Sequence, residues 1–189
     1  DKVALITGGG QGIGFGIAQE FVSLGAKVVI TGRNVDTLNK AVSMLGSSTV
    51  GIQHDITVKG SYTNLLKEID TYFGSLDILV NNAGINCKKD SLETTDEEFH
   101  NVIDTNLTSL FALTREVLKG MVDQGKGSII NISSMSALFG LTQVAAYSSS
   151  KTALLGLTRS LASEYSYSGI RVNAIALGGT VTPMTRTGP

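Results

Sequence analysis

Near its N-terminus the sequence reads Val3-Ala4-Leu5-Ile6-Thr7-Gly8-Gly9-Gly10-Gln11-Gly12-Ile13-Gly14. The first five residues form a short apolar run typical of a buried strand, and a helical pattern follows the glycines. Glycine lets the backbone turn sharply and approach a ligand closely, and the free N–H groups that open a helix attract phosphate. We therefore expect the pyrophosphate of a dinucleotide at residues Gly8, Gly10, Gln11, Gly12, Ile13 and Gly14.

The rest of the chain repeats this alternation of strand and helix. Apolar runs rich in valine and isoleucine predict strands at residues 2–7, 27–31, 49–53, 76–81, 128–133 and 171–176. Longer amphipathic stretches predict helices at residues 12–24, 35–45, 59–73, 96–121 and 144–166. Such alternation is typical of a parallel sheet covered by helices on both faces. We predict one domain, residues 1–189, with an α/β Rossmann-type doubly wound sheet in strand order 3-2-1-4-5-6.

Composition excludes several classes of function. Fifteen basic and sixteen acidic side chains give a net charge of −1, without a basic stripe for nucleic acid. No apolar run is long enough for a membrane span, and the chain opens on a strand-like segment, so we expect a cytoplasmic protein without a signal peptide. The single cysteine, Cys87, fits a reducing compartment. His54 and His100 lack companions at metal-ligand spacing, so no metal is expected.

Two residues of the fifth predicted helix, Tyr147 and Lys151, suggest acid/base chemistry. Four helical positions apart, they project from the same face. A positive charge close to a phenol stabilises the phenolate, so Lys151 is expected to lower the pKa of Tyr147. Ser134, at the end of the fifth predicted strand, is the third candidate.

Two other interpretations of this helix remain open. The helix could simply bury the tyrosine in the core and extend the lysine into solvent. The segment Ser148-Ser149-Ser150-Lys151 also matches the S-x-x-K motif of serine acyl transfer, although neither S-D-N nor K-T-G occurs in the chain.

The fourth predicted helix carries a further polar candidate, Asn106. Thr95 and Glu98 form a capping box at the start of this helix. Phe99, Ile103, Asn106 and Leu110 then fall on one side of it, which leaves Asn106 as the polar member of an apolar stripe. The amide either bonds buried backbone or faces a site.

The end of the second predicted strand bears on the choice of cofactor. An acidic side chain at this position would bind the ribose hydroxyls of NAD, whereas the chain has Arg33 there. An arginine accepts a 2′-phosphate, so NADP(H) is predicted as the preferred cofactor, with NAD(H) as the alternative. Gln11, in the glycine turn, adds no second positive charge. Arg33 could also be a solvated side chain beside the helix cap Asn34.

Together these segments resemble the short-chain dehydrogenase/reductase family, and the resemblance covers nearly the whole chain. The T-G-x-x-x-G-x-G cofactor turn corresponds to residues 7–14, and the acid that contacts adenine corresponds to Asp55, followed by Ile56. The N-N-A-G motif is similar to Asn81-Asn82-Ala83-Gly84, of which Asn82, Ala83 and Gly84 would bind the cofactor. The active-site asparagine, serine and Y-x-x-x-K motif match Asn106, Ser134, Tyr147 and Lys151.

The resemblance implies an oxidoreductase that transfers a hydride between the nicotinamide cofactor and a ketone or secondary alcohol. Ser134 would hydrogen-bond the substrate oxygen, and Tyr147 would give or take its proton. Lys151 would also bind the nicotinamide ribose, and Asn106 would connect Lys151 to solvent protons. A dinucleotide-binding module that does no chemistry is the alternative.

The chain departs from the family pattern near its C-terminus. Leu177 stands where the family usually has proline, so we expect a looser loop over the nicotinamide, while Thr180 and Thr182 could contact its carboxamide. The family normally continues beyond the position of Pro189 with a substrate lid and a seventh strand. Without them, we expect the sixth strand to form an exposed edge.

The substrate and the assembly state are less well indicated. Segments 85–90, 135–142 and 182–187 are the expected pocket edges, where Lys88 and Lys89 could attract an acidic substrate. Relatives pair through the fifth helix, so a homodimer or homotetramer is expected. The small residues of this helix that would allow close packing are Ala145, Ala146, Ser149, Ala153 and Gly156.

Overall fold

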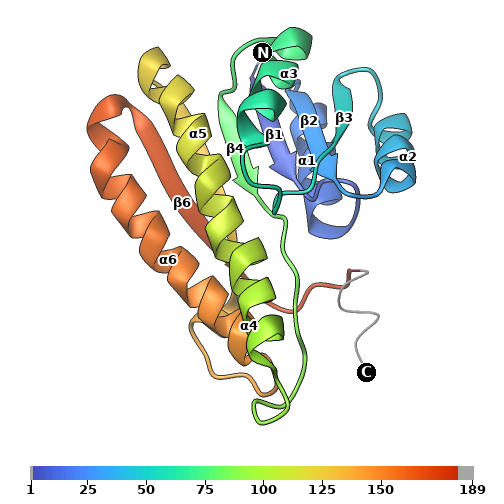
Figure 1. Ribbon diagram of the computed structural model, residues 1–189. Coiled ribbons are helices and arrows are strands. Elements are labelled where there is room, and N and C mark those ends of the chain that lie inside the picture. Colours follow the sequence, from blue (N-terminus) through green and yellow to red (C-terminus); the bar gives the residue numbers. More distant parts are fainter. Residues whose placement is uncertain (1, 183–189) are drawn as a thin grey trace.

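The computed structural model describes residues 2–182, which form one parallel sheet with helices on both faces (Figure 1). The strands are β1 (Val3–Thr7), β2 (Lys27–Gly32), β3 (Thr49–Gln53), β4 (Ile78–Asn81), β5 (Gly127–Ser134) and β6 (Ile170–Leu177). The α-helices are α1 (Gly12–Ser23), α2 (Val35–Leu45), α3 (Tyr62–Phe73), α4 (Asp96–Ile103), α5 (Ser109–Gln124) and α6 (Ala145–Tyr165). The strand order is β3-β2-β1-β4-β5-β6 and every pairing is parallel, which confirms the predicted fold.

Glycine conformations explain the largest differences from the predicted helix ends. The helix predicted from residue 59 begins only at Tyr62, because Gly60 has φ of 82°, outside the helical region. The helix predicted to end at residue 121 continues to Gln124 and stops at Gly125, whose left-handed conformation ends it. It is also interrupted by a π-helical turn, Asp104–Thr108, between α4 and α5.

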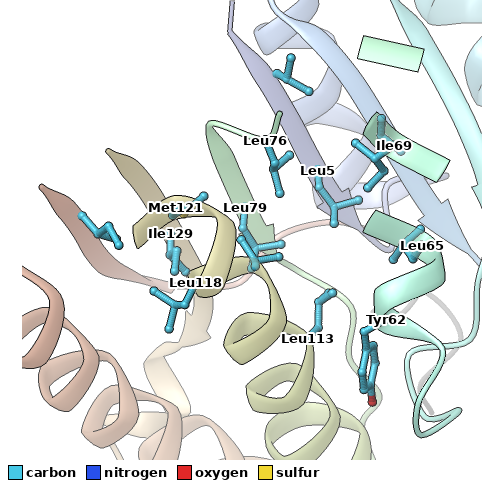
Figure 2. Close-up of a cluster of buried hydrophobic side chains, with 14 of the residues drawn as sticks. Leu5, Tyr62, Leu65, Ile69, Leu76, Leu79, Leu113, Leu118, Met121 and Ile129 are labelled. Atoms are coloured by element: carbon cyan, nitrogen blue, oxygen red, sulfur yellow. The ribbon is translucent and has the colours of Figure 1, made fainter. Parts of the chain in front are cut away.

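Two apolar clusters fix the sheet between its helices. Because side chains alternate along a strand, Leu5 of β1 belongs to the cluster beneath α3 and α5, and Ile6 to the cluster beneath α1 and α2. Figure 2 shows the first cluster, in which strand residues Leu5, Leu79 and Ile129 meet helix residues Leu65, Ile69, Leu113, Leu118 and Met121. Both clusters pack against the strands whose carboxyl ends carry the predicted site residues, so close packing on both faces holds these strands in place.

The sixth strand forms an exposed edge of the sheet, as expected, and most of the small residues of α6 lie on an exposed face of the helix. Within residues 2–182, β6 pairs with β5 alone, and Ile175 is 47% exposed. Ala145, Ser149 and Ala153 are exposed along α6, whereas Ala146, expected on the same face, is buried because it projects toward the body of the domain. Pairing of copies through this helix remains a prediction.

No helix in the described part of the chain is long and apolar enough to cross a membrane.

Candidate active site

A cleft of about 380 Å³ lies at the carboxyl ends of the strands, where ligands bind in open α/β sheets. Its walls come from the ends of β1, β2, β3 and β4, together with β5, α6 and the segment after β6. All predicted cofactor residues except one line it: Gly8, Gly10, Gln11, Gly12, Ile13, Arg33, Asp55, Ile56, Asn82, Ala83, Gly84, Tyr147, Lys151 and Thr180. The fold therefore brings these predicted residues together in one cleft, and their contact with a cofactor stays a prediction.

Gly14 is the exception, and its role is steric. A Cβ at this position would lie 2.4 Å from the carbonyl oxygen of Gly8 and 2.5 Å from Nδ2 of Asn82. Gly14 thus lets α1 pack against the turn and the loop after β4, and it does not line the cleft. Contact of Gly14 with a cofactor stays a prediction, and the lining of the cleft does not add to it.

Thr7 joins the glycine turn to the loop after β4, and sequence reasoning gave it no separate role. Its Oγ1 accepts hydrogen bonds from the backbone N–H groups of Asn82 and Ala83, both at 3.0 Å. In return, Asn82 Nδ2 donates to the carbonyl oxygens of Thr7, at 2.9 Å, and Gly8, at 3.1 Å. The available signal was the place of this threonine at the end of the first strand, directly before the glycine turn.

The start of α1 suits a phosphate. Gln11 caps this helix in an extended conformation without a side-chain cap bond, and the first turn contains no acidic residue. Backbone N–H groups at a helix start carry partial positive charge and bind phosphate readily. The turn therefore fits the pyrophosphate of a dinucleotide.

The far end of the cleft collects polar residues after β2 and β3. Asp55 Oδ1 accepts hydrogen bonds from Thr57 N, at 2.9 Å, and Thr57 Oγ1, at 2.8 Å. The backbone N–H of Thr57 is the main reason that the pKa of Asp55 lies below its usual value, so its carboxylate is ionised at neutral pH. Arg33 lines the same end, next to Asn34, which caps α2 through Thr37 N at 2.8 Å.

His54 also lines this end of the cleft. Its Nε2 lies 2.8 Å from Ser61 Oγ, whose hydroxyl donates to the carbonyl of Val58. Among residues 2–182, no three His, Cys, Asp or Glu side chains are grouped to hold a metal ion.

The catalytic candidates Ser134, Tyr147 and Lys151 meet at the opposite end of the cleft. Lys151 Nζ lies 5.6 Å from the centre of the Tyr147 ring and donates to the carbonyl oxygen of Ile132 at 2.7 Å. The lysine is 3% exposed, and burial lowers its pKa to about 8. The alternative of a lysine extended into solvent is excluded.

The expected effect of Lys151 on Tyr147 is not found in this structure. Burial raises the pKa of Tyr147 above its usual value, and a hydrogen bond with Ser134 acts in the opposite direction without cancelling it. The ammonium of Lys151 is directed to the Ile132 carbonyl, and its own charge is disfavoured by burial. Tyr147 is therefore a protonated phenol at neutral pH.

Asn106 does not line the cleft; it holds one of its walls from behind. The amide is fully buried in the π-helical turn, where Oδ1 accepts from Ile85 N at 2.8 Å and Nδ2 donates to Ile85 O at 2.9 Å. Nδ2 also donates to Ser150 Oγ at 3.1 Å, and Ser150 in turn donates to the carbonyl of Tyr147 at 2.7 Å. Asn106 thus links the loop after β4 to the catalytic turn of α6.

The π-helical turn also corrects the predicted apolar stripe. Phe99 is 36% exposed, whereas Leu110 is buried. A π turn inserts an extra residue, so side chains before and after it no longer share one helix face.

Two loops border the substrate side of the cleft. In the loop after β4 the charge of Lys89 is paired with an acidic side chain, and the loop after β5 exposes apolar side chains. Lys89 Nζ donates to both carboxylate oxygens of Glu98 at 3.0 Å, so this lysine is paired within the protein. The large side chains exposed after β5 are Met135, Leu138, Phe139 and Leu141.

The end of β6 and the segment after it complete the cleft. Leu177, Gly178, Thr180 and Thr182 line it, and Thr180 Oγ1 donates to the Gly178 carbonyl at 3.4 Å. The part of the predicted pocket edge at 183–187 lies outside the described residues.

Comparison with known proteins agrees with this geometry. The family model described as short chain dehydrogenase matches residues 2–188. The chain is 37% identical to a 3alpha-hydroxysteroid dehydrogenase of Mediterraneibacter gnavus, covering 100% of this chain and 78% of the relative. It is 38% identical to a 3-oxoacyl-[acyl-carrier-protein] reductase of Escherichia coli (98% and 76%). It is 39% identical to an NADP-dependent (R)-specific alcohol dehydrogenase of Lentilactobacillus kefiri (97% and 75%).

Solved structures give the same result. An actinorhodin polyketide ketoreductase variant with NADPH superposes with a TM-score of 0.94 at 35% identity, covering 97% of this chain and 72% of that one. A 3-ketoacyl-(acyl-carrier-protein) reductase from Brucella melitensis complexed with NADH gives a TM-score of 0.95 at 31% identity (98% and 78%).

Proposed function

Because this chain belongs to the short chain dehydrogenase family, we propose that it is an NADP(H)-dependent oxidoreductase that interconverts a ketone and a secondary alcohol with Tyr147 as general acid/base. The observation that carries this proposal is the meeting of Ser134, Tyr147 and Lys151 at one end of a cleft whose other end holds the glycine turn. A nicotinamide cofactor, when bound, supplies the hydride, and the protein supplies the proton and the geometry.

Each catalytic side chain has a role that its surroundings support. Ser134 lies in hydrogen-bonding contact with Tyr147, so both can reach one substrate oxygen. Tyr147 holds a proton at neutral pH, which is the form that donates to the oxygen of a ketone as it is reduced. Lys151, anchored on the Ile132 carbonyl, places a cation beside the phenol that would offset charge developing on it. The same phenol would take the proton back when an alcohol is oxidised.

The preference for NADP(H) rests on the end of β2. Arg33 lines the cleft there and stands directly after the strand, in place of a carboxylate, so a 2′-phosphate would meet a cation. One relative is named as NADP-dependent, and the two similar solved structures contain NADPH and NADH respectively. We propose NADP(H) as preferred and NAD(H) as tolerated.

The substitution Tyr147→Phe tests the chemical role. It removes the hydroxyl proton donor and keeps the ring, so we expect turnover of carbonyl compounds to fall by about 10²- to 10⁴-fold. Affinity for NADPH should stay within about twofold, because the glycine turn and Arg33 are untouched. Oxidation of NADPH followed by absorbance, with a panel of ketones, measures turnover, and Tyr72→Phe, on the exposed surface of α3, is the control.

The alternative is a binding module of the same fold that does no chemistry. It predicts NADPH binding without turnover of any carbonyl compound, for the wild type and Tyr147→Phe alike. If the wild type and Tyr147→Phe were equally active, the protein would still be an enzyme, but Tyr147 would not be its general acid/base.

A further inference from the structure

The two loops on the substrate side of the candidate active site are joined by one backbone hydrogen bond. The first loop, residues 82–95, runs from β4 to α4, and the second, residues 135–144, runs from β5 to α6. Lys89 N in the first donates to Gln143 O in the second at 2.8 Å. Figure 1 shows the loops side by side beyond the ends of α4 and α6.

The residue that accepts this bond has an unusual backbone. Gln143 has φ of 63°, and in residues 2–182 every other residue with positive φ is glycine. A side chain with a Cβ is disfavoured in this region, so the surrounding structure must hold Gln143 there. The side chain of Gln143 is exposed, and no side-chain atom of this residue forms a hydrogen bond within residues 2–182. The backbone bond from Lys89 N to Gln143 O is therefore the interaction that this conformation makes possible.

The partner loop is held before this contact, at Ile85, and at the contact residue itself. Ile85, four residues before Lys89, is fixed through both its backbone polar groups by Asn106. The Lys89 side chain is held by Glu98, which itself accepts from Thr95 N at 2.9 Å in the capping box of α4. The Lys89 amide is therefore a fixed donor, and the Gln143 carbonyl must be directed to it.

The position of Gln143 connects this contact to the chemistry. Tyr147 follows it by four residues, and Val144, the N-cap of α6, has no side-chain cap bond to fix the start of the helix. We propose that Gln143 is a positioning residue for Tyr147. Through its left-handed backbone, it ties the first turn of α6 to the loop that carries Asn82, Ala83 and Gly84. This inference rests on the proposed function.

A substitution series at this single exposed position tests the proposal. Glycine and asparagine adopt positive φ readily, whereas the β-branched valine does not. We expect Gln143→Gly and Gln143→Asn to keep kcat/KM for a ketone within about twofold of the wild type. Gln143→Val should lose about 10- to 100-fold, because misplacement of a catalytic group by about 1 Å has effects of this size. The Kd for NADPH should be equal in all four proteins.

Hydrogen exchange of the Lys89 amide provides a second measurement that needs no substrate. Exchange should be slow in the wild type and in Gln143→Gly and fast in Gln143→Val. Assays well below the unfolding temperature of each variant separate this effect from loss of fold. Gln143→Thr, also β-branched but polar, should behave like Gln143→Val.

Different results would overturn the proposal or the function beneath it. Full activity in Gln143→Val, or loss of activity in Gln143→Gly, would refute a positioning role of the backbone. Wild-type protein without turnover of any ketone would refute the proposed function, and the amide exchange would then show separately whether the contact itself depends on φ at residue 143.

Discussion

Replacing Lys151 with methionine should make the protein more stable at neutral pH while removing its activity. Burial lowers the pKa of this lysine from its usual value of 10.5 to about 8. A pKa difference of one corresponds to about 1.4 kcal/mol, so keeping this ammonium charged in the folded protein at pH 7 costs about 3 kcal/mol. Loss of the hydrogen bond to the Ile132 carbonyl offsets about 1 kcal/mol of the gain. We expect a net increase of about 2 kcal/mol in the free energy of unfolding.

The pH dependence of this effect identifies its cause. Between about pH 8 and 10.5 the unfolded chain binds more protons at Lys151 than the folded protein does, so the free energy of unfolding of the wild type rises with pH there. Below about pH 8 the full destabilisation is present. Lys151→Met lacks this titration, so its advantage over the wild type should shrink as the pH rises from about 8 toward 10.5.

Urea unfolding of both proteins at about pH 7 and about pH 9.5 measures the difference. Lys67→Met, in an exposed part of α3, is the control and should keep the pH dependence of the wild type. A Lys151→Met variant that is less stable than the wild type at neutral pH would refute the reasoning. So would an advantage that is the same at both pH values, because the gain would then come from packing and not from the buried charge.

Two further substitutions test the cofactor end of the cleft. Gly14→Ala places a Cβ 2.4 Å from the Gly8 carbonyl oxygen, so NADPH affinity should fall by about tenfold or more. The control Gly16→Ala, whose Cβ would have no atom within 4 Å, should bind NADPH as the wild type does. Titration calorimetry compares the two variants, and equal binding would contradict the steric role of Gly14. Arg33→Ser should weaken NADPH binding by about 10- to 100-fold and leave NADH binding nearly unchanged, because a charge-assisted contact with the 2′-phosphate is lost. Equal weakening of both cofactors would mean that Arg33 does not select between them.

The fold could be predicted because its signals are local and agree with one another. A parallel strand buried on both faces is a continuous apolar run, so the strands at residues 3–7 and 27–32 were visible in the sequence. The glycine turn then fixed the place of the cleft. The π-helical turn of Asn106 had no such signal, because it depends on hydrogen bonds to Ile85 across the fold.

In the candidate site, too, residues with a local sequence signal could be predicted, and residues that depend on contacts across the fold could not. Residues that face the cleft through a strand end or a helix turn were recognised, but Thr7 was not, since a threonine at the end of a strand is also an ordinary strand residue. Lys89 was considered for substrate binding because its partner Glu98 is nine residues away on another element. Gln143 could not have been singled out, because positive φ in a residue other than glycine is imposed by tertiary contacts.

Tyr147 and Lys151 show how a correct contact can accompany a wrong pKa. Helical spacing placed the two side chains together, and in water the lysine would have lowered the pKa of the phenol. In the folded protein α6 packs onto β5, and this packing removes water from both groups. Desolvation disfavours the phenolate as well as the ammonium, so the pKa of Tyr147 rises while that of Lys151 falls. The same burial that builds the site therefore leaves the phenol holding the proton that reduction of a ketone requires.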